Sequence, residues 1–196
     1  HDGEARQLAE ALLERREEVL ERIALVRDLP LKGQRIRCHG DYHLGQVLWT
    51  GMDFMIIDFE GEPMRPLGER RLKRSCLSDV AGMCRSIDYA ANAGLNRLVE
   101  LGVIAQTPGE DDPLRRLADY WSFNVQAAFL RGYLATAGPP LIPSDVDDVA
   151  PLLEAWTLHK CSYEVDYELN NRPDWVAIPL RGILRLLDEP PSEPVS

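Results

Sequence analysis

The chain has 196 residues, a formal net charge of −10, 45% hydrophobic residues and 28% charged residues. This composition is ordinary for a globular protein and excludes wholesale disorder. No apolar run approaches the ~20 residues of a membrane-spanning helix, and the acidic balance argues against nucleic acid as a partner. The four cysteines show no disulfide or metal-binding pattern, so we expect a cytoplasmic protein with no membrane partner.

The first part of the chain combines helix-like and strand-like patterns. Residues 2–28 show the apolar periodicity of one long amphipathic helix. Residues 34–38 alternate like a strand, and the short apolar runs 46–49 and 53–57 lie on either side of a turn. We therefore expect a small β-element of two or three strands that contains a hairpin.

The remainder of the chain predicts helices. Apolar periodicity and end signals place them over residues 78–102, 113–137, 145–171 and 174–187. Ser78-Asp79 and Ser144-Asp145 are candidate N-caps for two of them. Residues 189–196 contain three prolines, and we expect them to form a frayed, flexible tail. The pattern as a whole predicts a mainly α fold with a small β-hairpin.

Polar residues whose side chains could bind a metal ion or accept a proton gather around the predicted hairpin. If residues 51–53 form its turn, antiparallel pairing places Gln46 opposite Asp58 at the open end. Amide and carboxylate oxygens suit Mg²⁺, which usually takes only one or two protein ligands beside phosphate and water. Asp41 lies five residues before Gln46, where its carboxylate could accept the proton of a substrate hydroxyl.

This spacing resembles the catalytic loop of protein kinases, H-R-D-x-x-x-x-N, followed by the metal-binding D-F-G. Gln46 stands at the Asn position, and Asp58-Phe59-Glu60 replaces D-F-G. The resemblance implies that Asp41 is the catalytic base and that Gln46 and Asp58 bind Mg²⁺ on the phosphates of ATP. Glu60 would add a metal or substrate contact. The alternative is that Asp41 caps a loop and that His39 is structural.

A longer resemblance covers residues 35–187. The motifs H-G-D-x-H-x-x-Q and D-F-E-G-E-P, together with residues 66–91 and 160–175, resemble the bacterial maltokinases, including those fused to trehalose synthase. That family has the aminoglycoside phosphotransferase-like, or protein-kinase-like, fold. The resemblance implies ATP-dependent phosphorylation of maltose to maltose 1-phosphate, in a route from trehalose to glycogen or other α-glucans.

The same resemblance bears on domain organisation. The family's β-rich N-lobe covers ATP and supplies a phosphate-binding lysine, whereas the segment before the catalytic loop is helix-like here. We therefore expect residues 1–188 to be a C-terminal lobe, with the N-lobe outside this chain and a trehalose synthase as a possible fused or associated partner. Such a lobe alone is expected to be inactive or nearly so.

Candidate sugar contacts lie in three places. Sugar sites need planar donors and acceptors together with an aromatic face. On a helix over residues 160–170, the polar and aromatic side chains recur four residues apart. We predict that the sugar contacts are His43, Arg71, Asp88, Tyr167, Glu168 and Arg172. The alternatives are a structural histidine at residue 43, solvated helix or loop positions, and, for Asp88, an ion pair with Arg85.

Three other hypotheses stay open from the sequence. One is a kinase for another sugar, an aminoglycoside or a small alcohol within the same superfamily. A second is a non-catalytic, sugar-binding appendage of a trehalose synthase, although Asp41, Gln46 and Asp58 are all retained. A third is a metal-dependent hydrolase that uses His39 and His43 as ligands beside the two aspartates.

Overall fold

The computed structural model describes residues 2–28, 33–105, 113–143 and 145–188. Helices form most of these ranges: α1 (Asp2–Glu14), α2 (Arg16–Asp28), α3 (Leu67–Arg70), α4 (Leu77–Glu100), α5 (Pro113–Thr136), α6 (Val146–Asn171) and α7 (Ala177–Asp188). Strands β1 (Val47–Trp49) and β2 (Phe54–Ile56) pair antiparallel. Single 3₁₀ turns span Leu44–Gln46 and Pro173–Trp175. The prediction of a mainly α fold with a small β-hairpin is confirmed.

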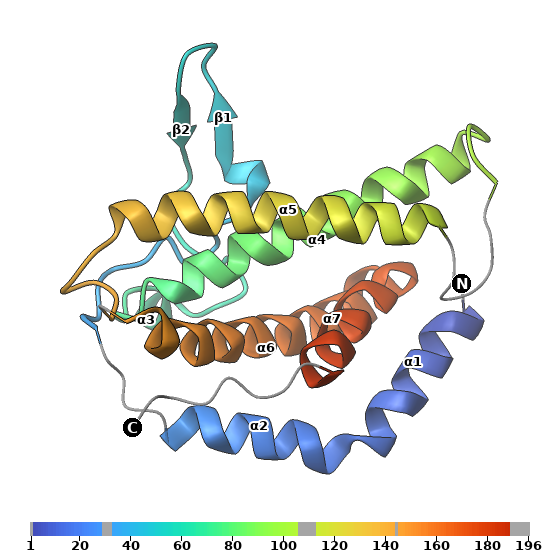
Figure 1. Ribbon diagram of the computed structural model, residues 1–196, viewed down its shortest axis with the longest axis horizontal. Helices are drawn as coiled ribbons and strands as arrows, with labels where there is room; N and C mark the ends of the chain where they lie inside the picture. The colour runs from blue at the N-terminus through green and yellow to red at the C-terminus, as the bar shows by residue number, and fades with distance from the viewer. Residues whose placement is uncertain (1, 29–32, 106–112, 144, 189–196) are drawn as a thin grey trace.

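The helices pack around α4 and α6 (Figure 1). Helix α4 contacts α5 and α6, and α7 packs against α6. Helix α1 lies along α7 and α2 lies along α6, so the two N-terminal helices cover the far side of the bundle from the hairpin. The hairpin projects from the helical body. None of the helices in the described ranges has the length and hydropathy needed to cross a membrane.

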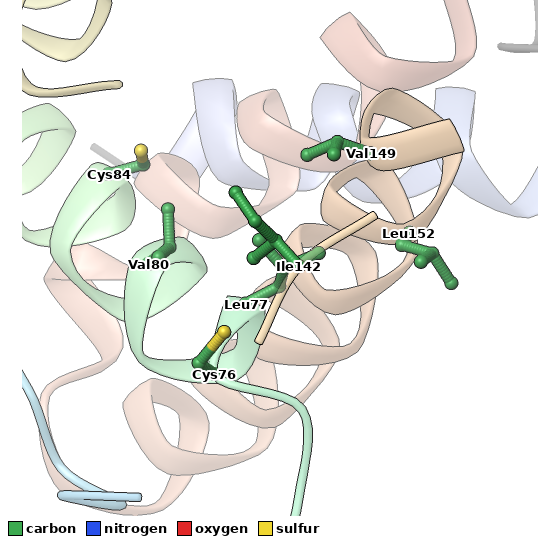
Figure 2. Packing of buried hydrophobic residues seen from close by; sticks show 7 residues of the cluster. All are labelled: Cys76, Leu77, Val80, Cys84, Ile142, Val149 and Leu152. Carbon is green, nitrogen blue, oxygen red and sulfur yellow. The ribbon is translucent and has the colours of Figure 1, made fainter. Parts of the chain in front are cut away.

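A buried apolar cluster joins the start of α4 to the chain around α6 (Figure 2). It consists of Cys76, Leu77, Val80, Cys84, Ile142, Val149 and Leu152. Phe129 and Tyr133 of α5 pack against it. Each fully buried aliphatic side chain stabilises the fold by about 1.5–3 kcal/mol. The cluster therefore fixes the first turns of α4, which lie next to residues 39–46, the predicted catalytic loop.

Two sequence predictions for the N-terminal part are wrong. The single helix expected over residues 2–28 is interrupted at Arg15, because α1 and α2 pack on different helices and the chain bends between them. The Arg15 guanidinium contacts Glu18 and Asp188 at this bend. The strand expected over residues 34–38 is reduced to one isolated bridge between Ile36 and Arg74, since no longer partner segment lies beside it in the described chain.

Helix starts show which predicted caps are real. Asp145 accepts a hydrogen bond from the backbone N–H of Asp147, which confirms it as the cap of α6; Ser144 lies outside the described residues. Helix α4 begins at Leu77 and has no side-chain cap, so the predicted capping role of Ser78-Asp79 is wrong. The Asp79 carboxylate points to a distant loop instead. The predicted tail, residues 189–196, also lies outside the described residues.

Candidate active site

The hairpin register differs from the predicted one by a single residue. Val47 pairs with Ile56, and the Ile57 N–H donates to the Gln46 carbonyl at 3.0 Å, so Gln46 faces Ile57 rather than Asp58. The Asp58 backbone then turns into the left-handed region, with φ 61°. That turn brings its carboxylate back to Gln46, whose Nε2 donates to Asp58 Oδ2 at 3.0 Å.

The Asp79 carboxylate holds the predicted catalytic loop by binding the loop's backbone N–H groups. The N–H groups of His39 and Gly40 donate to the two Asp79 carboxylate oxygens at 2.7 and 2.9 Å. On the other side, His39 Nε2 lies 2.7 Å from the Ile57 carbonyl oxygen. Because a carbonyl can only accept, Nε2 carries the proton. His39 is therefore a structural residue that ties the loop to the end of β2.

The Asp41 carboxylate lies in a positive environment. His43 Nε2 is 3.7 Å from Asp41 Oδ2, while His43 Nδ1 accepts the Gly45 N–H at 3.0 Å, so the proton of the neutral ring lies on Nε2. His43, and more weakly Lys160, lower the pKa of Asp41 in spite of partial burial. Asp41 is therefore ionised at neutral pH, which is the form in which a carboxylate can accept a proton.

The predicted magnesium ligands Gln46 and Asp58 lie together at the open end of the hairpin. The Gln46 amide nitrogen donates to one Asp58 oxygen, which leaves the second Asp58 oxygen and the amide oxygen as candidate metal ligands, and Glu60 is exposed on the turn that follows. Mg²⁺ commonly takes one or two carboxylates and completes its shell with phosphates and water. Within the described ranges, no three His, Cys, Asp or Glu side chains gather as metal ligands. His39 and His43 each have one ring nitrogen at a backbone group, the Ile57 carbonyl and the Gly45 N–H, which counts against both serving as hydrolase metal ligands through those nitrogens.

A pocket opens beside Asp41, between the predicted catalytic loop, the segment after β2 and the middle of α6. Its lining includes Asp41, Glu62, Arg65, Trp156, Lys160 and Tyr163. With Tyr42, it offers three aromatic side chains together with charged donors and acceptors, which is the chemistry that a sugar requires.

Tyr163 is the centre of this pocket wall. Lys160 Nζ and Arg65 Cζ lie 5.1 and 5.8 Å from its ring centroid, close enough for cation–π attraction. Burial, followed by the charge of Glu62 and a hydrogen bond with it, raises the pKa of Tyr163 to about 12. Lys160 and Tyr163 share one helix face, so their spacing could have identified them, whereas Glu62 and Arg65 had no sequence signal as pocket residues.

All six predicted sugar contacts lie outside this lining. Arg71 is exposed, and its neighbour Arg70 lines the pocket instead. Tyr167 stacks beside Tyr163, with 6.4 Å between ring centroids, one turn further along α6. His43 faces Asp41 at the edge of the site. A sugar-binding role for these residues stays a prediction.

Asp88 and Glu168 are buried, at 3% and 1% exposure, and each accepts hydrogen bonds from an arginine of its own helix or cap. Arg172 donates two hydrogen bonds to Glu168, at 3.0 and 2.7 Å, and Asp88 accepts from Arg85 at 2.6 Å. The ion pair that the sequence left open for Asp88 is thus present. Sequence inspection could not place these groups, because burial of a polar helix residue is decided by its tertiary neighbours.

Sequence comparisons agree with this geometry. Residues 1–61, which contain Asp41 and Asp58, match the phosphotransferase enzyme family. The glucosamine kinase of Streptacidiphilus jiangxiensis is 30% identical over 161 residues, covering 79% of this chain and 32% of the relative. The glucosamine kinase of Mycolicibacterium smegmatis is 31% identical over 154 residues, covering 77% and 34%. The chain thus spans about a third of the length of these curated relatives.

Solved structures define the fold class. A glucosamine kinase in one crystal form matches with a TM-score of 0.62 and 25% identity over 94% of this chain and 46% of the other. A complex of glucosamine kinase with glucosamine, ADP and inorganic phosphate matches with a TM-score of 0.62, 24% identity, and 94% and 48% coverage. The chain has the fold of the C-terminal lobe of a kinase-like, aminoglycoside phosphotransferase-like enzyme. Particular likenesses are to glucosamine kinases, and the maltokinase resemblance stays a prediction.

Proposed function

We propose that the protein carrying this chain is an ATP-dependent sugar kinase and that this chain forms its acceptor-binding, catalytic lobe. The observation that carries the proposal is the convergence of three groups. Asp41 lies on a loop held by Asp79, the Gln46–Asp58 pair lies at the open end of the hairpin, and a pocket with aromatic walls opens beside Asp41.

In the proposed reaction, Asp41 accepts the proton of the attacking sugar hydroxyl. The bond between the sugar oxygen and the γ-phosphorus of ATP forms while the bond from that phosphorus to the ADP oxygen breaks. Gln46 and Asp58 would hold Mg²⁺, with Glu60 as a further contact. When bound, the ion neutralises charge on the phosphates. Lys160 adds a positive charge near Asp41, which favours its ionised form.

The acceptor that we propose first is maltose, phosphorylated at its anomeric hydroxyl, as the maltokinase resemblance implies. The acids and bases along the pocket balance: Asp41, Glu62, Glu69 and Asp79 face Arg65, Arg70, Arg74 and Lys160. A balanced lining with Trp156 and Tyr163 suits a neutral sugar, which offers hydroxyls to both kinds of charge and C–H faces to the rings. A trehalose synthase would supply this substrate.

Glucosamine is the second candidate acceptor, because two curated relatives of this chain are named glucosamine kinases. An ammonium group would need an acidic partner, and Glu62 and Glu69 are the pocket carboxylates that neither the proposed proton transfer nor the loop anchor uses. Tyr163, however, already hydrogen-bonds to Glu62.

Acceptor-dependent ADP release by the protein that carries this chain tests the proposal. We expect kcat/KM for maltose to exceed that for glucosamine, and a loss of about 10²–10⁴-fold in Asp41→Asn. The exposed Asp166→Asn on α6 is the matched control and should retain turnover. A higher kcat/KM for glucosamine than for maltose would make glucosamine the proposed acceptor. A rate of ADP release that does not increase with either sugar, or that is unchanged in Asp41→Asn, would contradict the proposed function.

A further inference from the structure

Helix α4 uses two neighbouring faces for two different tasks. One face carries Asp79, Gly82 and Ser86, at helical spacing, and meets the catalytic loop. Asp79 binds the loop N–H groups, and Ser86 Oγ accepts the Leu44 N–H at 3.0 Å. A side chain at Gly82 would come within 2.8 Å of the Tyr42 carbonyl oxygen, so the loop backbone rests directly on the helix.

A neighbouring face of α4 carries a buried charge network centred on Arg85. Arg85 is 4% exposed; its Nε donates to Glu164 of α6 at 2.9 Å, and its Nη1 donates to Asp88 at 2.6 Å. Asp88 also accepts from Ser122 of α5 at 3.2 Å. A side chain at Gly182 of α7 would lie 2.8 Å from Arg85 Nη1, so the α7 backbone closes over the guanidinium.

The two faces connect the two halves of the candidate active site. Ser86, which follows Arg85 directly, supports the loop that carries Asp41. Glu164, which Arg85 holds, follows Tyr163 directly and lies one turn after Lys160, and both of these line the pocket. A single α4 segment thus links the catalytic loop to the wall that faces it.

We propose that Arg85 is a positioning residue that sets the separation between the catalytic loop and the pocket wall on α6. A planar guanidinium donates to two carboxylates in fixed directions, so it determines the offset of α6 relative to α4. Apolar packing between the same helices would hold them together without setting that offset as sharply, since it is not directional. Arg85 touches neither the loop nor the pocket and acts through Ser86 and Glu164.

Burial makes this anchor sensitive to substitution. Glu164 is 8% exposed and Arg85 Nη2 has no hydrogen-bond partner among the described residues. Removing the guanidinium leaves Asp88 and Glu164 buried without their common cation, and the helices must separate or admit water to relieve this. Either response moves Lys160 and Tyr163 away from Asp41.

Hydrogen exchange on the full chain tests the proposal without reference to activity. In Arg85→Met, we expect amides of residues 39–46 and 156–164 to exchange faster by about tenfold or more, while other helical amides change much less. Arg97→Met, at an exposed arginine on the same helix, is the matched control and should change neither segment. A uniform increase over all helices, or a change on α6 alone, would overturn the positioning role.

Two further variants guard against a misfolded Arg85→Met. Glu164→Gln keeps an acceptor for Arg85 and should give the same pattern in weaker form, and a uniform pattern would again overturn the proposal. Arg85→Lys keeps the charge but cannot donate along both directions. The kinetic test of Arg85→Lys rests on the proposed function. In this variant, we expect the KM for the sugar to rise by about tenfold while the KM for ATP stays within about twofold of the wild-type value. If the wild-type protein that carries this chain is inactive, the proposed function is contradicted. The hydrogen-exchange pattern would still decide the role of Arg85.

Discussion

Asp58 combines an exposed carboxylate, a predicted metal ligand, with a backbone conformation that L-residues rarely adopt. Its φ of 61° turns the chain out of β2 and directs the carboxylate to Gln46. Such a conformation costs a non-glycine residue about 1–2 kcal/mol. At this position, backbone strain accompanies one particular direction of the carboxylate, a combination that is common at functional sites.

Replacement of Asp58 by glycine or alanine isolates this strain. Both variants lose the carboxylate and its bond with Gln46, so they differ in backbone freedom alone. We expect Asp58→Gly to have a free energy of unfolding about 1 kcal/mol higher than Asp58→Ala in urea denaturation. Equal stabilities, or a more stable alanine variant, would show that residue 58 is not strained.

His43 controls the protonation of Asp41. The imidazole, with Lys160, lowers the pKa of the Asp41 carboxyl, so the ionised form persists to lower pH. Without His43, the pKa rises, and the acid limb of the pH–kcat/KM profile should move to higher pH in His43→Ala. His43→Gln keeps a donor near Asp41 and should shift the limb less. An acid limb that stays in place or moves to lower pH in His43→Ala would contradict this role.

At the scale of elements, α4 positions the catalytic loop by close backbone contact at Gly82. We expect Gly82→Ala to push the Tyr42 carbonyl away, lowering the free energy of unfolding by about 1–3 kcal/mol and reducing turnover. Gly94, on the same helix with open space around it, is the control, and Gly94→Ala should raise stability by about 0.5–1 kcal/mol. Thermal unfolding measures both, and a harmless Gly82→Ala would refute the close contact.

The elements that sequence inspection predicted are those with a local signal. The helices and the hairpin follow from apolar periodicity, and the convergence of Gln46 with Asp58 follows from turn position, although the register is shifted by one residue. Asp79 looks like a helix cap because it stands at a helix start. Its bonds to His39 and Gly40 cross about 40 residues of chain, and no local pattern reports them.

Buried polar groups were beyond prediction for the same reason. Asp88 and Glu168 carry the residue types of a sugar site, yet tertiary packing buries them against Ser122 and Tyr89. The pocket wall itself, with Glu62 and Arg65, is assembled from a loop and a helix about 100 residues apart, so only the fold brings it together.

At the scale of the whole molecule, the N-terminal helices are attached to the bundle by apolar contacts and ion pairs. Arg22 of α2, at 6% exposure, pairs with Glu154 of α6, whereas Arg6 and Glu10 of α1 form an exposed pair. We expect Arg22→Ala to lower the free energy of unfolding by about 3 kcal/mol and Arg6→Ala by less than about 0.5 kcal/mol. Similar losses in urea denaturation would mean that α2 is not anchored by a buried charge.

The central claim is that Asp41, beside the Gln46–Asp58 pair, promotes phosphoryl transfer to a sugar. Phosphorus-31 NMR of the protein that carries this chain, with Mg-ATP and either maltose or glucosamine, tests it most directly. We predict a new sugar phosphate resonance, in the sugar 1-phosphate region for maltose, that is absent in Asp41→Asn. A spectrum that shows ATP and ADP but no sugar phosphate with either acceptor, or a product that persists in Asp41→Asn, would contradict the account.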